Sequence, residues 1–307
     1  MPPIDLLTVG EAFQDLIFVG LPHMPRRGEE LRTAAFVSTI GGGAVITATA
    51  ASRLGLQTAI VSALSAEAVR ALRQDRVRVV NVKRPAEAHA VTVSLSTLQD
   101  RAFVTFNGVN DRLEARLLAH VARLRARHVH LAFAPRNGAR WVRIVSGLRA
   151  RGVTTSWDFG WNPPLGSAPG FTALVESSDF IFVNEAEAAL YARSRRTDTT
   201  LAFWRRAARN TILKRGPKGS RWIVGDASDF SAPAPPVRVV DTTGAGDAFN
   251  GGFLTAWLNG RPPRECLRLG NFVGAQSTTA PGGVDALPFR PTSPTRPSRP
   301  TRLGGLR

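Results

Sequence analysis

Short apolar segments alternate with amphipathic segments along most of this chain, and that alternation constrains the fold more than any other feature. The apolar segments are typical of buried strands and cover residues 5–10, 58–63, 128–133, 153–157, 180–183, 211–214 and 221–224. The segments between them have helical spacing and cover 43–54, 65–74, 112–126, 137–151, 185–193 and 201–209. Strands and helices in this order form βαβ units with right-handed crossovers. The sequence therefore predicts an α/β fold with a doubly wound, mostly parallel sheet flanked by helices.

Two segments depart from this rhythm and alternate apolar and polar residues with a period of two. They are residues 15–19 with 30–37, and residues 90–106. Strands of this kind have one apolar face that needs a partner. We expect a small β-sheet lid, built from about 12–38 and 90–106, that covers the main domain or pairs with a second copy in a homodimer.

The remaining composition bounds the class of protein. A chain of 307 residues with 43% hydrophobic residues can bury a large core, so we expect one main domain over 1–289. The tail, 290–307, is rich in Pro and Arg and is expected to be disordered. The sequence contains no long apolar run and no signal peptide, which predicts a cytoplasmic protein without a membrane span. The single cysteine, Cys266, excludes an intramolecular disulfide.

The formal charge of +17 raises the question of nucleic acid. Ten Lys or Arg residues lie in 193–221, but arginine is also spread over the predicted helices 112–126 and 137–151. This distribution is a general bias and not a focused stripe, so nucleic-acid binding is not expected. Attraction of anionic phosphates toward a cleft is the more modest consequence.

The segment 240–254, VDTTGAGDAFNGGFL, carries the chemistry. It predicts a strand that ends near Val240, a glycine-rich turn, and a helix that begins at about Asp247. Small residues let the backbone approach a ligand closely, and free N–H groups at a helix start attract anions. An aspartate at that position can accept a proton from an attacking hydroxyl, although an incidental helix cap is the alternative.

The string DTTGAGDAFNGGF resembles the C-terminal signature of the ribokinase-like (PfkB-type) carbohydrate kinases over thirteen successive positions. The resemblance implies ATP-dependent phosphorylation of a hydroxyl on a small sugar or sugar-like substrate. It makes Asp247 the catalytic base, and it assigns the anion hole to Gly244, Ala245, Gly246 and the Asp247 amide. ATP and Mg²⁺ are the cofactors that the resemblance implies.

A second match, GGGAVITATAASRLG at 41–55, concerns the acceptor. Gly41 and Gly42 resemble the glycine pair that touches the sugar in this family. Asp15, in VGEAFQD, resembles the family's aspartate at the end of the first strand, which holds sugar hydroxyls. These residues are therefore expected to bind the substrate.

The acceptor end also departs from the family pattern. Ile46 stands where the family has a sugar-binding asparagine, Phe133 stands where sugar-specific members often have a glutamate, and the segment 62–80 is shortened. Both side chains are expected at the substrate, which predicts a less polar or differently held acceptor. A nucleoside kinase, with these side chains against a base, is one alternative. A catalytically weakened nucleotide-binding or regulatory homologue is another.

Further matches concern the nucleotide. Lys214, Gly216 and Gly219, in LKRGPKGS, resemble the strand and turn that border the nucleotide, and Asn271 is assigned to the same site. Asp158 follows a predicted strand at a position where the family often has a polar residue near the phosphates. The cofactor site is therefore expected to combine residues from distant parts of the chain.

Two pairs of oxygen-bearing residues are candidate metal ligands. Asn184 and Glu187, in FVNEAEAAL, resemble the Asn-x-x-Glu element that organises Mg²⁺ and its waters, and a capping box is the alternative for that spacing. Asp241 and Thr243 fall where many members hold a monovalent cation, so K⁺ is a further cofactor that the resemblance suggests.

Overall fold

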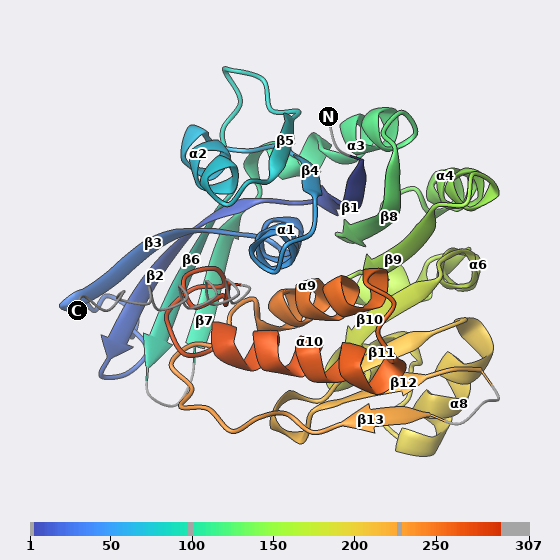
Figure 1. Ribbon diagram of the computed structural model, residues 1–307. Coiled ribbons are helices and arrows are strands. Elements are labelled where there is room, and N and C mark those ends of the chain that lie inside the picture. The colour runs from blue at the N-terminus through green and yellow to red at the C-terminus, as the bar shows by residue number, and fades with distance from the viewer. Residues whose placement is uncertain (1–2, 98–100, 226–228, 290–307) are drawn as a thin grey trace, which may run out of the picture.

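The computed structural model describes residues 3–97, 101–225 and 229–289, and it confirms the predicted α/β fold (Figure 1). The large sheet has nine strands in the order β13-β12-β11-β10-β9-β8-β1-β4-β5, and a second sheet has four in the order β3-β2-β6-β7. In the large sheet the strands from β11 to β5 run parallel. The two strands at the other edge, β12 and β13, run antiparallel.

The strands of the large sheet are β1 (Ile4–Gly10), β4 (Thr58–Ser62), β5 (Arg78–Asn81), β8 (Ala126–Ala132), β9 (Thr154–Asp158), β10 (Phe180–Asn184), β11 (Thr211–Lys214), β12 (Ser220–Ile223) and β13 (Phe230–Ala232). The strands of the small sheet are β2 (Phe13–Leu21), β3 (Ala35–Gly41), β6 (Val91–Thr97) and β7 (Arg101–Phe106). The α-helices are α1 (Gly43–Arg53), α2 (Ala66–Gln74), α3 (Glu114–Val121), α4 (Gly138–Ala150), α5 (Pro163–Ser167), α6 (Phe171–Ser177), α7 (Glu185–Tyr191), α8 (Thr197–Ala207), α9 (Ala245–Leu258) and α10 (Pro263–Ser277). Two 3₁₀ helices, Gly108–Arg112 and Gly216–Lys218, lie in loops.

Helices cover both faces of the large sheet, which explains why its parallel strands are apolar on both sides. Helices α3 to α8 pack on one face, around Leu7, Val9 and Trp157. Helices α1, α2, α9 and α10 pack on the other, around Leu6, Ile60 and Phe182. No helix in the described part of the chain is long and apolar enough to cross a membrane.

Helix α9 lies in close contact with both α1 and α10, and its glycines explain how. A side chain on Gly251 would lie 2.6 Å from the Ala50 Cβ of α1, and one on Gly252 would lie 2.8 Å from the Leu269 carbonyl oxygen of α10. Paired glycines therefore let three helices approach one another without a gap. This packing fixes the start of α9 at the carboxyl edge of the sheet.

The small sheet forms the predicted lid and projects beside the large sheet in Figure 1. Its strand β2 pairs with β3 and β6, and β3 ends at Gly41, directly before α1. The exposed side chains of Phe36, Phe103 and Phe106 lie on this sheet. Residues 98–100 of the predicted lid segment and the predicted tail, 290–307, lie outside the described residues.

Several local features differ from the sequence prediction. Residues 233–241 contain no strand, because Pro233, Pro235 and Pro236 have no N–H to donate to a sheet. Helix α9 begins at Ala245, two residues earlier than predicted. The elements that the sequence does not predict are β5, β13, α5, α6 and α10.

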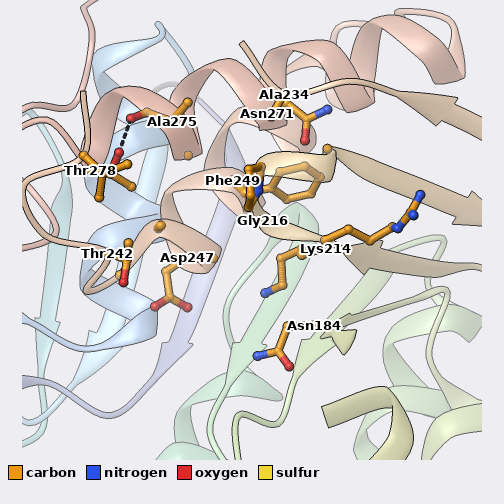
Figure 2. A pocket seen from close by; sticks show the side chains of 18 of the residues that line it. Asn184, Lys214, Gly216, Ala234, Thr242, Asp247, Phe249, Asn271, Ala275 and Thr278 are labelled. Atoms are coloured by element: carbon orange, nitrogen blue, oxygen red, sulfur yellow. Dashed lines mark hydrogen bonds between the residues drawn. The ribbon is translucent and has the colours of Figure 1, made fainter. Parts of the chain in front are cut away.

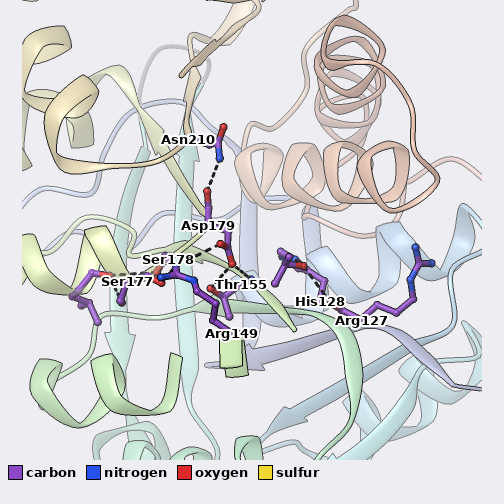
Figure 3. A network of polar contacts seen from close by, with 10 residues as sticks. Arg127, His128, Arg149, Thr155, Ser177, Ser178, Asp179 and Asn210 are labelled. Atoms are coloured by element: carbon purple, nitrogen blue, oxygen red, sulfur yellow. Dashed lines mark hydrogen bonds and ion pairs between the residues drawn. The ribbon is translucent and has the colours of Figure 1, made fainter. Parts of the chain in front are cut away.

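A polar network joins the amino ends of the central strands (Figure 3). The Asp179 carboxylate accepts hydrogen bonds from the Thr155 N–H at 2.8 Å and the Thr155 hydroxyl at 3.2 Å, and it lies 3.4 Å from the Arg149 guanidinium. The Asn210 amide donates to the Asp179 carbonyl oxygen at 2.9 Å. These contacts tie β9, β10 and β11 together at the edge opposite the helix start of α9.

Candidate active site

The carboxyl ends of three parallel strands meet the start of α9 at one cavity (Figure 2). Asp158 ends β9, Asn184 ends β10 and Lys214 ends β11, while α9 contributes Asp247. The cavity has a volume of about 740 Å³, enough for a nucleotide-sized ligand. The parallel order of the sheet therefore gathers four polar side chains that lie far apart in the sequence.

The turn before α9 is shaped by glycine. Gly244 is the N-cap of the helix and has a φ of 71°, a left-handed conformation that glycine adopts without strain. The Ala245 N–H donates to the Thr242 carbonyl oxygen at 3.3 Å, and the Asp247 N–H donates to the Gly244 carbonyl oxygen at 3.0 Å. The N–H groups of Gly244 and Gly246 have no acceptor among the described residues. Of the predicted anion hole, these two amides are therefore available to bind a phosphoryl oxygen.

Asp247 lies within the first turn of α9 and is half-buried. A Cβ atom on Gly43 would lie 2.8 Å from Asp247 Oδ1, so the glycine leaves room for the carboxylate. Burial raises the pKa of Asp247 to about 7, and the negative charges of Asp158 and Glu187 act in the same direction. The Lys214 ammonium opposes them. A carboxylate with this pKa is a base suited to neutral pH.

Lys214 holds a buried charge network at the donor end. Its Nζ atom lies 2.7 Å from Asp158 Oδ2 and 3.4 Å from Asn250 Oδ1, and the Asn250 amide donates to the same Asp158 oxygen at 2.8 Å. A Cβ atom on Gly246 would lie 3.0 Å from Lys214 Nζ. The ammonium therefore sits directly against the turn, and Figure 2 shows it pointing toward Asp247.

Asn184 and Glu187 form a capping box at the start of α7, as the alternative interpretation predicted. The Asn184 side chain accepts from the Glu187 N–H at 2.8 Å, and the Glu187 carboxylate accepts from the Asn184 N–H at 2.9 Å. Burial raises the pKa of Glu187, and the nearby Asp158 raises it further. The capping box does not exclude a role near a metal, because it fixes both oxygen-bearing side chains at the cavity.

The charges of the site fit a hard divalent cation. Asp158, Glu187 and Asp247 are three acids that interact with one ammonium, that of Lys214. Among the described residues, no three Asp, Glu, His or Cys side chains are grouped closely enough to hold a metal by themselves. A cation here would complete its coordination shell with water and phosphate oxygens, which is how Mg²⁺ is usually bound.

Asp241 and Thr243 lie in the loop that leads to the turn. Asp241 Oδ1 accepts from the Thr243 N–H at 2.9 Å and from the Thr243 hydroxyl at 2.8 Å, and Oδ2 accepts from the Gly282 N–H at 2.9 Å. These bonds join the loop to the segment after α10. A monovalent cation at these residues stays a prediction.

The predicted nucleotide residues line the cavity. Gly216 and Gly219 have φ values of 54° and 84° in the turn after β11, and a side chain on Gly219 would overlap the Ala232 carbonyl oxygen. The Asn271 amide donates to the carbonyl oxygens of Ala232 at 3.0 Å and Pro233 at 3.1 Å. Asn271 therefore holds the loop that forms one wall of the cavity.

Asp15 and the predicted glycine pair lie next to each other, outside the lining of the large cavity. Asp15 is on β2 of the lid, and not at the end of the first strand as the resemblance implied, because β1 ends at Gly10 and the chain turns into the lid. A side chain on Gly41 would overlap the Asp15 carboxylate. Burial raises the pKa of Asp15 to about 6, and Asp241 contributes to the increase.

Ile46 and Phe133 are both buried, Ile46 against the turn before α9 and Phe133 against two tryptophans. Ile46 is 2% exposed, and its Cδ1 atom packs between Gly244 and Gly283. The Phe133 ring packs 5.2 Å from Trp141 and 5.5 Å from Trp157, measured between centroids. Neither side chain lines the large cavity, which is also true of Asp15, Gly41 and Gly42, and Phe133 lines a separate small cavity of about 30 Å³. Their contact with a substrate stays a prediction.

Some residues of the cavity were missed from the sequence. Asn250 was not singled out, although it lies inside the DAFNGG string and bonds both Lys214 and Asp158. The wall formed by Ala234, Pro235, Pro236 and Val237 was also missed. A proline-rich stretch without periodicity predicts only a connecting loop. Its position as a cavity wall depends on the hydrogen bonds from Asn271 of α10.

Comparison with known proteins places these features in a family. The family model described as "pfkB family carbohydrate kinase" matches residues 4–290. Fructokinase-2 of Zea mays is 30% identical over 284 residues, which cover 83% of this chain and 84% of that protein.

Two solved structures share the fold. Adenosine kinase from Sinorhizobium meliloti has a TM-score of 0.79 at 22% identity, covering 93% of this chain and 98% of that one. A putative ribokinase II from E. coli, solved in complex with ATP and Mg²⁺, has a TM-score of 0.75 at 21% identity, with 92% and 96% coverage.

Proposed function

Because the chain belongs to the pfkB family of carbohydrate kinases, which transfer phosphate to hydroxyl groups, we propose that it phosphorylates a small sugar or sugar-like molecule with ATP. The observation that carries this proposal is the position of Asp247. Its carboxylate lies at a large cavity, beside a glycine turn with an available amide and near a buried ammonium. This arrangement suits proton removal from an alcohol next to a held phosphate.

Asp247 acts as the general base in this proposal. The acceptor hydroxyl approaches from the side of Gly43 and Asp15, and its proton passes to the Asp247 carboxylate as the oxygen attacks the terminal phosphorus. The bond from that phosphorus to the bridging oxygen breaks, and ADP leaves. A base with a pKa of about 7 is ionised in a large fraction at neutral pH and still binds the proton well. The burial that raises this pKa is therefore part of the function.

The Gly246 N–H and the Lys214 ammonium stabilise the negative charge that spreads over the transferring phosphoryl oxygens. Both face the same region, since the ammonium lies against Gly246. Fixed donors of this kind need no rearrangement during the reaction. Asp158 and Asn250 hold the ammonium in place.

The turn with Gly216 and Gly219 and the wall held by Asn271 bind the nucleotide in this proposal. Asn184 and Glu187 hold Mg²⁺ through water. The bound cation would offset charge on the phosphates of ATP. The excess of acids over lysine at the cavity supports this assignment.

The lid would close over the acceptor and exclude water, which otherwise competes as the acceptor. Pairing of two lids in a homodimer is a further part of the proposal. The exposed Phe36, Phe103 and Phe106 side chains support it.

A nucleoside acceptor is the alternative within this proposal, with Ile46 and Phe133 against a base. A regulatory homologue is less favoured, since it would have no need of a buried lysine beside the turn.

A coupled ADP-release assay with ATP and Mg²⁺ tests the proposal against pentoses, hexoses, sugar acids and nucleosides. We expect ADP and a phosphorylated product in equal amounts with at least one sugar-like acceptor. In Asp247→Asn, kcat should fall by about 10² to 10⁴ while ATP still binds. Silence across the panel, with ATP bound, would instead identify a nucleotide-binding regulator. Turnover of nucleosides alone would identify a nucleoside kinase.

A further inference from the structure

Ile46, in the first turn of α1, is buried between two glycines that lie far apart in the sequence. A Cβ atom on Gly244 would lie 2.4 Å from Ile46 Cδ1, and a Cβ atom on Gly283 would lie at the same distance from it. The backbones also approach each other, since a Cβ atom on Gly244 would lie 3.1 Å from the Gly283 Cα atom. The Ile46 side chain therefore fills the contact between the turn before α9 and residues 281–287 after α10, which we call the strap.

The two glycines lack a side chain for different reasons. Gly244 has a φ of 71°, which by itself favours glycine. The described glycines with a positive φ do not include Gly283, so its backbone conformation accepts other residues. The obstacle at Gly283 is Ile46, whose Cδ1 and Cγ1 atoms would lie 2.4 and 2.9 Å from an added Cβ atom. Glycine at this position is therefore explained by the space that Ile46 takes.

Helix α1 holds the strap at a second point, through Arg53. The Arg53 Nη1 atom donates to the carbonyl oxygens of Val284 at 2.8 Å and Leu287 at 3.3 Å. The Asp75 carboxylate fixes the same guanidinium, because it accepts from Nε at 2.8 Å and from Nη2 at 3.0 Å. Ile46 and Arg53 are seven positions apart and lie on one face of α1. One rigid helix face therefore contacts the strap at two places.

The strap and α1 also bind the chain on either side of the glycine turn. The Gly282 N–H of the strap donates to Asp241 Oδ2 at 2.9 Å, in the loop that leads into the turn. The Thr47 hydroxyl of α1 donates to the Asp247 carbonyl oxygen at 3.0 Å, just after the turn. With both flanks held, the volume of the Ile46 side chain sets how far the turn lies from the strap.

We propose that Ile46 is a positioning residue for phosphoryl transfer, whose side chain places the anion-hole turn by filling the space between Gly244 and Gly283. The inference rests on the proposed kinase function. Donors aimed at a transferring group lose much of their effect when they are displaced by about 1 Å, so a change in the packed volume here lowers kcat. Binding of the substrates changes less, because these donors act mainly in the transition state.

Gly283→Ala is the direct test, because it adds one methyl group where Ile46 already lies. With the acceptor that gives the highest kcat/KM in the panel above, kcat should fall at least about tenfold, while the KM values of ATP and of the acceptor change less than about threefold. Gly147→Ala is the matched control, since a Cβ atom on Gly147 meets nothing within 4 Å, and its kcat should be unchanged. A kcat in Gly283→Ala equal to that of the control would refute the inference and leave the kinase function intact. No phosphorylation by the unaltered protein would overturn both.

Ile46→Val separates positioning from a general loss of packing, because it removes the Cδ1 atom that a side chain at Gly283 would meet. In Gly283→Ala it should raise kcat at least about threefold, since it makes room for the new methyl group. In the otherwise unaltered protein it should lower kcat at least about threefold, since it leaves a gap beside the turn. Ile60→Val removes one methyl group from the same hydrophobic cluster and should change kcat little in either background.

The opposite signs in the two backgrounds are the decisive result, because a purely structural role would lower kcat in both. If Gly283→Ala does not fold, Ile46→Val alone still decides, by the ratio of its kcat to that of Ile60→Val at equal unfolding temperature. A kcat no lower in Ile46→Val than in Ile60→Val would refute the proposal. A change confined to the KM of the acceptor would also refute it, and would place Ile46 at the substrate instead.

Discussion

The donor end and the acceptor end of the site hold their acidic side chains in different ways. At the donor end, Asp158 accepts hydrogen bonds from both Lys214 and Asn250. At the acceptor end, Asp15 is 8% exposed, and its carboxylate has no hydrogen-bond or ion-pair partner in the described part of the chain. Under the proposed function, the donor end is complete before any ligand arrives, whereas the acceptor end is complete only with one.

This difference matches the tasks of the two ends. A nucleotide presents the same phosphates in every cycle, so fixed charges that need no rearrangement suit it. An acceptor must be recognised among similar small molecules, and unsatisfied buried groups reject any ligand that fails to pair with them. Because unsatisfied buried groups lower the stability of the free protein, this means of discrimination makes the acceptor end less stable without a ligand.

Replacing Lys214 should make the donor end resemble the acceptor end, where a buried carboxylate has no partner. In Lys214→Met, the Asp158 carboxylate stays buried without its cation, and the free energy of unfolding should fall by about 3–5 kcal/mol. Urea denaturation followed by tryptophan fluorescence measures this change. The nucleotide should also bind more weakly, by calorimetry with ATP and Mg²⁺.

Lys218→Met is the matched control for this change. The Lys218 side chain is 66% exposed and lies 3.7 Å from Glu185, so its loss should cost less than about 1 kcal/mol. If Lys214→Met were no more destabilising than this control, the ammonium could not be the partner that holds Asp158 in the fold.

Neutralising Asp15 at the acceptor end should change the free energy of unfolding in the opposite direction and make the protein more stable. The pKa of Asp15 is raised to about 6 by burial and by Asp241. The folded protein therefore binds this proton more tightly than the unfolded chain, and the stability contribution present below about pH 4 is lost as the pH rises through about 6. Asp15→Asn keeps the uncharged form at every pH.

We expect Asp15→Asn to raise the free energy of unfolding at pH 8 by up to about 3 kcal/mol and to change it little at pH 4. Thermal and urea unfolding at both pH values measure this pattern. Glu30→Gln is the control, because that side chain is 77% exposed, and it should leave both values within about 0.5 kcal/mol. A loss of stability at pH 8 in Asp15→Asn would mean that the carboxylate has a partner in the free protein.

The sequence predicted the donor end better than the acceptor end, for a physical reason. Gly244, Gly246 and Asp247 lie in one contiguous string, so local chain geometry alone places them together. The strands that end at Asp158 and Lys214 were also visible as apolar runs. The bond between these two residues spans 56 positions, and only the strand order brings them side by side.

The acceptor end depends on contacts that no local pattern contains. The substrate roles of Ile46 and Phe133 stay predictions. No local pattern indicates that Ile46 packs between Gly244 and Gly283, or that Phe133 packs against Trp141 and Trp157. Helix α10 was missed because Gly270 and Gly274 weaken its helical pattern, yet both face Phe249 of α9 at close range.

The two ends are linked electrostatically through Asp247, and this gives the smallest of the expected effects. The pKa of Asp247 is raised to about 7, first by burial and then by Asp158, with Asp15 among the later contributions. Because the base must be ionised, kcat/KM should fall about tenfold per pH unit below about 7.

In Asp15→Asn this acidic limb should move to lower pH, since one negative charge near Asp247 is removed, while in Glu30→Gln it should not move. The position of the limb, and not its height, is the quantity to compare, because Asp15→Asn also weakens acceptor binding. A limb that stays at the same pH in Asp15→Asn would show that the two ends titrate independently, and the acceptor end would then influence the chemistry only through binding.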